Sequence, residues 1–405
     1  MKISYFMHDV GHPDLVRRCE MLRIGGAETR IFGFHRARSP DAEVADRVVG
    51  LGRTVDAGFA QRIWAVACAI PRIRKWAGQL AASDIILARN LEMLLLATIA
   101  QRWYAPHAAL VYECLDIHRL MLSTHIVGAA LRALERLLLG RCRGLMVSSP
   151  GFIREYFART HTNLPKTFVV ENKVFSTNGP SMRGATVLPG PPWRIGWFGV
   201  LRCRRSLQLL SRLVRSALGL VEVVAAGLPA TSVFPDAEKA FGGISGFTYL
   251  GSYKDEAELS RLFGSVHLAW AVDFYESGGN SDWLLSNRLY RAILYGAVPV
   301  ALANVETGRW LSANGSGILL SEPIEEQLIT AMTSLTSESL AKARGALARV
   351  PTSALTTDAE ECRELVRSLA ALREDGPEAS NTQRLARGRG DHFGGDSDRD
   401  VDLRQ

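Results

Sequence analysis

Three arginines follow an apolar run in the second half of the chain: Arg202, Arg204 and Arg205. The run, residues 194–200, predicts a buried strand. Residues 206–218 repeat apolar side chains at helical spacing, with Ser206 as the expected N-cap. A helix N-terminus attracts anions through its free N–H groups and its dipole. One arginine side chain can also donate two parallel hydrogen bonds to the oxygens of a phosphate. The turn therefore predicts a diphosphate site, for which a solvated basic turn is the alternative.

A second candidate site lies in residues 275–296, YESGGNSDWLLSNRLYRAILYG. Gly278 and Gly279 allow the backbone to approach a ligand closely. Asn287 begins the next helix, with Arg288 in its first turn, so this is a second helix start suited to an anion. The polar side chains around it could bind a sugar or a base, and a long surface loop is the alternative.

Titratable side chains stand in two further loops. The loop at residues 8–14 holds His12 beside Gly11, which permits close backbone approach to a ligand. Glu113, Asp116 and His118 lie at and after a later apolar run. A carboxylate and an imidazole in such a loop can deprotonate an acceptor hydroxyl. A helix-capping Asp and a surface His are the alternative.

Alternating strands and helices would position these loops. Short apolar runs predict strands over 3–7, 29–34, 84–88, 109–114, 144–147 and 167–170, then over 194–200, 221–226, 246–250, 267–272 and 298–301. Helix-spaced segments lie between many of these runs, which favours an α/β fold with parallel sheets. Ligands bind beyond the carboxyl ends of the strands in such sheets, and the candidate loops begin there.

Composition divides the chain into parts. Residues 176–192 are rich in Gly, Pro and Ser and lack periodicity, which is typical of a linker. We therefore expect one Rossmann-like domain at 1–180, a second at 193–350 and a C-terminal helix at 351–374. Apolar residues almost vanish in 375–405, so this tail is expected to be disordered.

The totals exclude several classes of protein. A chain of 405 residues with 47% hydrophobic residues is typical of a globular protein of about two domains. The six cysteines form no CxxC pair and no zinc-ligand pattern, which favours reduced thiols. The N-terminus resembles no secretory signal, and no apolar stretch reaches the ~20 residues of a membrane span, so we expect a cytoplasmic protein. The basic residues that give the net charge of +7 are scattered along the sequence, and no nucleic-acid-binding motif is present, so nucleic-acid binding is not expected.

Two segments mix apolar and basic residues. Residues 62–76 contain two tryptophans among arginines and a lysine, and Pro71 is expected to interrupt a helix there. Residues 126–139 are strongly apolar with Arg132 and Arg136. Such segments can lie in an anionic lipid interface. Core-packed helices with solvated arginines are the alternative. Peripheral contact with the inner face of the plasma membrane therefore stays open.

Three motifs resemble those of the GT-B glycosyltransferases. Residues 199–206, GVLRCRRS, resemble the family's "G-x-L … K/R-G/S" turn. Residues 286–300, SNRLYRAILYGAVPV, resemble its "P-N-K-L-Y-E-A … G-x-P-V" helix, and residues 147–150, VSSP, its "vSs" segment. Over roughly residues 1–350 the chain is similar to glycosyltransferase family 4 and its bacterial exopolysaccharide-assembly members of the succinoglycan type.

This resemblance implies two Rossmann-like parallel-sheet domains facing a central cleft. It implies transfer of a sugar from a nucleoside diphosphate donor, with UDP as the expected nucleotide, to a lipid-linked saccharide, without metal or cofactor. The expected donor-binding residues are Gly11, Gly199, Arg202, Arg204, Arg205, Asn287, Arg288, Tyr290 and Glu306. The expected catalytic residues are Asp116, His118 and His12. An inverting reaction would need one of them as a base, whereas a retaining reaction can proceed without one.

One departure concerns the family's Glu-x7-Glu pattern. Arg291 stands where the family has a ribose-binding Glu, and Trp283 stands where it has the partner Glu. Asp282, Glu276 or Glu306 could substitute, or the ribose is bound differently. Two other functions therefore stay open. One is a nucleotide-sugar epimerase on the same fold, and the other is a catalytically degenerate pseudo-glycosyltransferase that acts as an assembly partner.

Overall fold

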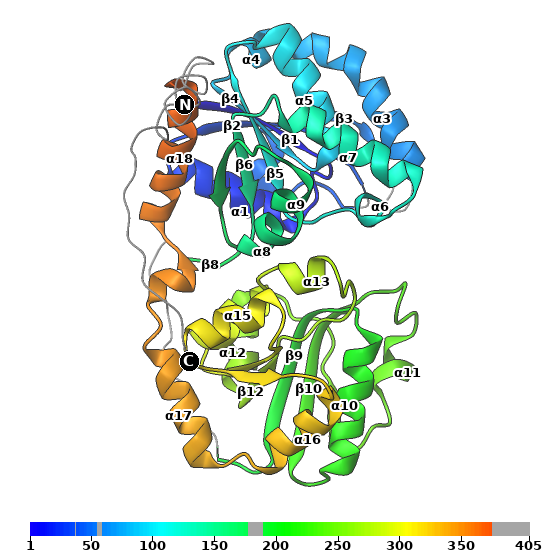
Figure 1. Ribbon diagram of the computed structural model, residues 1–405, viewed down its shortest axis with the longest axis vertical. Helices are drawn as coiled ribbons and strands as arrows, with labels where there is room; N and C mark the ends of the chain where they lie inside the picture. The colour runs from blue at the N-terminus through cyan, green and yellow to red at the C-terminus, as the bar shows by residue number, and fades with distance from the viewer. Residues whose placement is uncertain (37, 55–58, 177–188, 375–405) are drawn as a thin grey trace, which may run out of the picture.

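Two α/β bodies, one above the other in Figure 1, make up the part of the chain that the computed structural model describes, residues 1–36, 38–54, 59–176 and 189–374. Each body contains one sheet of parallel strands with helices on both faces. We call the body that contains the first sheet the N-body and the other the C-body. The predicted α/β fold with two parallel sheets is confirmed.

The N-body is built on a seven-stranded sheet in the order β3-β2-β1-β4-β5-β6-β7. Its strands are β1 (Lys2–Met7), β2 (Glu28–His35), β3 (Val48–Arg53), β4 (Ile85–Arg89), β5 (Ala109–Cys114), β6 (Gly144–Val147) and β7 (Lys166–Val169). Every residue of β4 and β5 is buried, as expected for central parallel strands covered on both faces. The strand order reverses between β1 and β4, so the loops after these two strands leave a crevice.

The C-body repeats this plan with six strands in the order β11-β10-β9-β12-β13-β14. They are β9 (Trp193–Leu201), β10 (Val221–Pro229), β11 (Phe247–Tyr249), β12 (Leu268–Trp270), β13 (Val298–Leu302) and β14 (Ile318–Leu320). Here the order reverses between β9 and β12. The second crevice therefore follows these two strands.

Helices bury one apolar face each against the sheets. In the N-body, α1 (Pro13–Ile24) and α2 (Ala42–Ala45) cover one face. The other face carries α3 (Phe59–Arg72), α4 (Ala77–Ala81), α5 (Leu91–Tyr104), α6 (Arg119–Leu122), α7 (Ile126–Leu139), α8 (Pro150–Phe152) and the adjoining α9 (Ala158–Thr160). The C-body contains α10 (Arg204–Ser216), α11 (Ala237–Phe241), α12 (Glu256–Gly264), α13 (Asn280–Trp283), α14 (Asn287–Leu294), α15 (Glu306–Ala313), α16 (Ile324–Thr333) and α17 (Ser337–Ala348).

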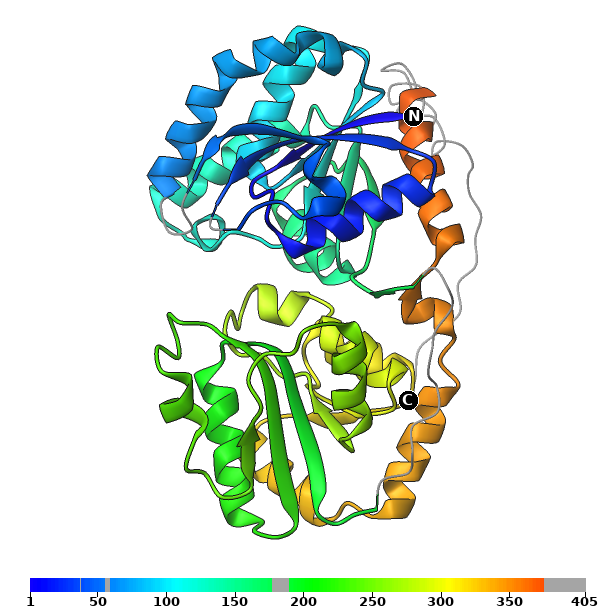
Figure 2. The same ribbon diagram turned by 180° about the vertical axis from the view of Figure 1, so that it is seen from behind.

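The chain returns to the N-body at its C-terminal end. Strand β15 (Thr356–Thr357) pairs with β8 (Val174–Phe175), and α18 (Ala359–Glu374) then packs against α1, as Figure 2 shows from behind. Arg143 donates to the carbonyl oxygen of Leu372 (3.0 Å), and Arg373 pairs with Asp84 (3.0 Å). The helix that follows the second domain in sequence therefore completes the first.

Several local features differ from the sequence-based expectation. Helix α10 begins at Arg204, because the thiol of Cys203 accepts the N–H of Ser206 (3.3 Å) and takes the cap position predicted for the serine. Pro71 lies inside α3, near its end, and does not interrupt it. Strand β3 was not anticipated. The predicted disordered tail at 375–405 and most of the predicted linker lie outside the described residues.

Candidate active site

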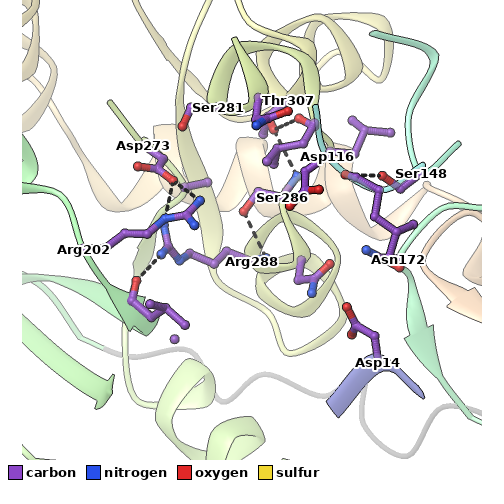
Figure 3. A pocket seen from close by; sticks show the side chains of 18 of the residues that line it. Asp14, Asp116, Ser148, Asn172, Arg202, Asp273, Ser281, Ser286, Arg288 and Thr307 are labelled. Atoms are coloured by element: carbon purple, nitrogen blue, oxygen red, sulfur yellow. Dashed lines mark hydrogen bonds and ion pairs between the residues drawn. The ribbon is translucent and has the colours of Figure 1, made fainter. Parts of the chain in front are cut away.

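A cavity of about 590 Å³ lies where the two bodies face each other. Its wall includes residues after β1 and β4 of the first sheet and after β9 and β12 of the second, which are the two crevices. Pockets for small molecules commonly have volumes of about 300–1,000 Å³. Figure 3 shows polar side chains from both bodies around this cavity.

The end of strand β9 shapes the wall on the C-body. Gly199 has φ of +109°, a conformation that side chains rarely adopt. Next to it, Arg288 donates from Nε to the carbonyl oxygen of Phe198 (2.8 Å) and from Nη2 to that of Val200 (2.9 Å). Two carbonyl oxygens therefore hold this guanidinium against the strand end, beside the cavity (Figure 3).

Arg202 supplies a second fixed cation on this wall. Its Nη2 lies 2.9 Å from the carboxylate of Asp273, which follows β12, and its guanidinium lies 5.0 Å from the ring centre of Tyr275. The ion pair joins the ends of the two strands that flank the crevice (Figure 3). Arg288, in contrast, is held by carbonyl oxygens and not by a carboxylate, so its positive charge remains to suit a diphosphate.

Helix α14 begins at the same wall. The hydroxyl of Ser286 accepts the N–H of Arg288 (3.3 Å), and Ser286 itself donates its N–H to the hydroxyl of Thr307 (3.3 Å). Ser286, Asn287 and Thr307 all line the cavity. The free N–H groups of this helix start add to the attraction that the two arginines exert on an anion.

Asp116 and His12 stand on the opposite wall, which belongs to the N-body. Asp116 keeps contact with solvent in the cavity, but desolvation by the surrounding protein, then Glu276 and Glu92, raises the pKa of its carboxyl. His12 caps α1 by accepting the N–H of Asp14 (3.3 Å), and burial lowers the pKa of its ring. A carboxylate with a raised pKa and a neutral imidazole can both accept a proton.

Two of the three arginines in the predicted phosphate turn point elsewhere. The guanidinium of Arg204 lies 5.9 Å from the ring centre of Phe234. Arg205 lies 4.3 Å from the ring centre of Phe274 and pairs with Glu322 (3.2 Å). Neither arginine lines the cavity that the described residues enclose.

Two further predicted donor-site residues connect the bodies. Tyr290 of α14 donates its hydroxyl to the carboxylate of Glu171 (2.9 Å), which follows β7. Glu306 pairs with Arg154 of the N-body (2.5 Å) and with Arg309 (3.2 Å). Within the described structure both lie away from the cavity wall.

The remaining predicted residues have local roles. His118 caps α6 by accepting the N–H of Leu120 (3.3 Å), and its Nε2 lies 3.2 Å from Arg62. A Cβ on Gly11 would lie 2.6 Å from the carbonyl oxygen of Arg38, so this glycine allows close backbone packing. Neither residue is part of the cavity wall that the described residues form.

Arg291, the departure from the family pattern, does line the cavity. Its guanidinium forms two contacts of 2.8 Å with the carboxylate of Glu256, which also accepts the hydroxyl of Tyr295 (2.9 Å). Trp283, at the other departing position, contacts the N-body: its carbonyl oxygen accepts the hydroxyl of Ser149 (2.6 Å). Arg291 therefore forms an ion pair at its position, and Trp283 forms a contact between the two bodies.

The cavity also contains His8 of the predicted loop at residues 8–14, and residues that the sequence did not single out as site residues, namely Arg89, Asn90, Ser148, Asn172 and Asp273. All of them end or follow strands of the two sheets. A place at or after the end of a strand was the sequence signal that could have indicated these residues. Many polar residues that do not line the cavity have the same place, so the signal alone does not select them.

Two general properties complete the description. Among the residues that the structure covers, no group of three or more His, Cys, Asp or Glu side chains could hold a metal ion. The described helices include none that is long and apolar enough to cross a bilayer.

Comparison with solved structures identifies the fold. Sucrose-phosphate synthase from Thermosynechococcus elongatus matches with a TM-score of 0.63 at 12% identity, covering 95% of this chain and 100% of that one. Anabaena Alr3699/HepE in complex with UDP and glucose matches with a TM-score of 0.64 at 14% identity, covering 91% and 99%. WaaG, a glycosyltransferase involved in lipopolysaccharide biosynthesis, gives 0.55 at 14%, covering 94% and 99%. The predicted GT-B fold is therefore confirmed.

Sequence comparison is more specific. No protein-family model matches the chain. The succinoglycan biosynthesis protein ExoL of Rhizobium meliloti (strain 1021) is 40% identical over 385 residues, which are 93% of this chain and 95% of that protein. Identity of this extent over nearly all of both chains goes well beyond a shared fold. The chain belongs to the family of the succinoglycan biosynthesis protein ExoL.

Proposed function

We propose that this protein is a glycosyltransferase that moves a sugar from a nucleoside diphosphate to a saccharide acceptor in exopolysaccharide biosynthesis. The observation that carries the proposal is the cavity that described residues of both bodies line. Its C-body wall presents fixed cations and a helix start, and its N-body wall presents proton acceptors. The relative's part in succinoglycan biosynthesis supports the exopolysaccharide setting.

The C-body wall would hold the donor. The arginines at 202 and 288 and the N-terminus of α14 would bind the diphosphate, with Gly199 leaving room for it. UDP is the proposed nucleotide, which the complexes of HepE with UDP and UDP-glucose support. In the proposed reaction the nucleotide sugar is the donor substrate, and no cofactor takes part.

The same groups would stabilise the leaving group without a metal ion. As the bond from the anomeric carbon to the diphosphate oxygen breaks, negative charge grows on that oxygen. Arg202, Arg288 and the N–H groups of α14 are already in place to stabilise it. We expect transfer to continue when divalent cations are removed with EDTA, and loss of activity would contradict the metal-free mechanism.

Asp116 is the proposed base. As the acceptor oxygen bonds to the anomeric carbon, its proton would pass to the Asp116 carboxylate, with His12 as the second proton acceptor on this wall. The raised pKa of Asp116 makes it a stronger base than an ordinary aspartate. Asp116→Asn should lower kcat by about 10²–10⁴-fold and leave UDP affinity unchanged.

A lipid-linked acceptor at a membrane surface is the proposed partner. On the N-body, Ile126 and Val127 of α7 are 88% and 52% exposed, Leu137 is 61% exposed, and Trp103 of α5 and Trp64 of α3 are 56% and 70% exposed. Exposed arginine side chains accompany them on the same helices. Exposed apolar side chains beside cations favour an anionic lipid interface.

Calorimetric titration with UDP and GDP tests the donor site. We expect the unmodified protein to bind UDP. Arg202→Ala should weaken binding by about tenfold or more, because a hydrogen bond to a charged group contributes about 1.5–3 kcal/mol. Arg205→Ala, which removes a neighbouring arginine that points elsewhere, is the matched control and should change nothing. Equal losses in both variants, or no nucleotide binding, would overturn the assignment.

A further inference from the structure

Arg89 has an unused hydrogen-bond donor beside the cavity. It is the last residue of β4, lies at the reversal point of the first sheet and lines the cavity, yet its side chain is only 2% exposed. Its Nε donates to the carboxylate of Glu113 (2.8 Å). Its Nη1 is buried and has no hydrogen-bond partner among the described residues. Buried N–H groups of charged side chains are seldom left unpaired, because the loss of water is then uncompensated.

The charges around Glu113 do not balance. This carboxylate is fully buried. It accepts hydrogen bonds from the guanidinium groups of Arg89 and Arg18 (2.8 Å) and from the hydroxyl of Tyr5. Burial alone would raise the pKa of Glu113, but the two arginines outweigh it and hold the pKa at about 2. The cluster therefore contains two cations and one anion at neutral pH. Of the two arginines, it is Arg89 that lines the cavity.

The groups that face Arg89 across the wall leave this positive charge available. His8 and His12 are its imidazole neighbours, and burial lowers the pKa of each ring, so neither adds a charge near neutral pH. Asp116 and Asp14 also lie on this wall, and Asp14 acts on Arg89 electrostatically, but no ion pair within 4 Å joins either carboxylate to Arg89 in the described structure. Asn90 adds a side-chain amide that lies 3.2 Å from Nδ1 of His8.

We propose that Arg89 binds an oxyanion carried by the acceptor, either a phosphate or a carboxylate group. The inference rests on the proposed function and adds a substrate class to it. Arg89, His8 and Asn90 belong to the crevice of the N-body, whereas the arginines assigned to the donor belong to the C-body on the opposite wall. A guanidinium that is already oriented by Glu113 loses little freedom when it binds a planar or tetrahedral oxyanion.

Two substitutions separate binding from folding. Arg89→Gln and Arg18→Gln each remove one guanidinium from the buried Glu113, so both should lower stability to a similar degree. Only Arg89→Gln changes the cavity wall. If the glutamine variants do not fold, Arg89→Lys and Arg18→Lys provide the same comparison with the charge retained and the planar fork lost.

The experiment titrates inorganic phosphate, and separately acetate, into protein saturated with UDP at constant ionic strength, and follows the melting temperature. A ligand that binds only the native state raises the melting temperature in a saturable way. We expect saturable protection of the unmodified protein and of Arg18→Gln, with affinity lower by about tenfold or more in Arg89→Gln. Protection by phosphate alone identifies a phosphate-bearing acceptor, and protection by acetate identifies a carboxylate.

Three results would overturn the proposal. The first is that neither anion protects the unmodified protein. The second is that an anion protects Arg89→Gln as well as it protects the unmodified protein. The third is that UDP abolishes the protection and that Arg89→Gln binds UDP tenfold more weakly. The last would assign Arg89 to the donor. Failure of the proposed function is distinguishable, because it appears as no UDP binding by the unmodified protein. The anion titration without UDP then still reports on Arg89.

Discussion

A buried carboxyl in α7 links the stability of the N-body to pH. Glu135 is fully buried and accepts the hydroxyls of Tyr156 (2.7 Å) and Tyr112 (3.3 Å). Burial raises its pKa to about 7, whereas an unfolded glutamate has a pKa of about 4.3. His161 lies 3.7 Å away, and burial lowers the pKa of its ring, so it does not supply a compensating charge near pH 7. Between the two pKa values of Glu135 the native state holds a proton that the unfolded chain has released.

The free energy of unfolding should therefore fall as pH rises from about 4.3 to about 7, and should lose on the order of 3 kcal/mol from this group. Glu135→Gln mimics the protonated carboxyl, so we expect it to be more stable than the unmodified protein at pH 8 and equally stable at a pH below about 4. Urea unfolding at both pH values measures the difference. Glu326→Gln, at an exposed carboxylate, is the control and should change neither value. A pH-independent effect of Glu135→Gln would contradict the assigned pKa.

At the scale of single elements, the close pairing of β9 with β10 fixes the donor wall. Gly227 of β10 lies opposite Gly199, and a Cβ on Gly227 would lie 1.8 Å from the carbonyl oxygen of Gly199. Gly227→Ala should push the end of β9 away and shift the carbonyl oxygens that hold Arg288. We expect lower stability and weaker UDP binding together, measured by urea unfolding and calorimetry.

A second glycine isolates the backbone contribution to that effect. Gly243 also has positive φ, +72°, but open space surrounds its Cβ position. Gly243→Ala should lower stability by only about 1 kcal/mol through the unfavourable φ and should leave UDP binding unchanged. Equal effects of the two substitutions would show that the contact between the strands does not position the donor wall.

Helix α7 provides a test of membrane contact. Changing Ile126 and Val127 to Ser removes two exposed apolar side chains, and we expect binding to phosphatidylglycerol vesicles to weaken by about tenfold or more, given roughly 1.5–3 kcal/mol for each fully buried side chain. Leu218→Ser removes a 72% exposed leucine from the C-body and is the matched control. Co-sedimentation measures both, and unchanged binding of the double variant would exclude α7 from the interface.

The elements were largely predictable, whereas the side-chain directions were not. Strand β5 and helix α7 match their expected bounds, because a buried parallel strand and an amphipathic helix each have a strong periodic pattern. The turn after β9 shows the limit. Cys203 caps α10, so Arg204 and Arg205 enter the helix while Arg202 stays before it and faces the cavity. A shift of two residues in a helix start turns the side chains by about half a turn.

The site depended on contacts that no local pattern records. Arg89 ends its strand one residue beyond the predicted boundary, and its partner Glu113 is distant in sequence. Helix α18 likewise has the pattern of an ordinary amphipathic helix, which does not say that it packs on α1 of the other body. Pairings of this kind are set by tertiary packing, so they appear only in the folded structure.

At the scale of the whole molecule, a few polar contacts hold the two bodies around the cavity. Asn280 of α13 is 4% exposed, and its side chain accepts the N–H of Ile117 (2.7 Å) and donates to the carbonyl oxygen of the same residue (2.9 Å). The contacts of Trp283 with Ser149 and of Glu306 with Arg154 lie beside it. Interfaces between domains of one chain commonly permit hinge motion, so these contacts are expected to favour the arrangement of the two bodies seen in this structure.

Asn280→Ala should therefore favour a more open arrangement. Loss of two hydrogen bonds between the bodies corresponds to about 1–3 kcal/mol, so we expect a larger radius of gyration by small-angle X-ray scattering. UDP affinity should change little, because the proposed donor site belongs to the C-body wall. Asn314→Ala, which removes an amide contact inside the C-body, is the control and should leave scattering unchanged. If Asn280→Ala also left the scattering unchanged, this contact would not help to hold the bodies together. A loss of UDP affinity in Asn280→Ala would contradict a donor site that belongs to the C-body wall alone.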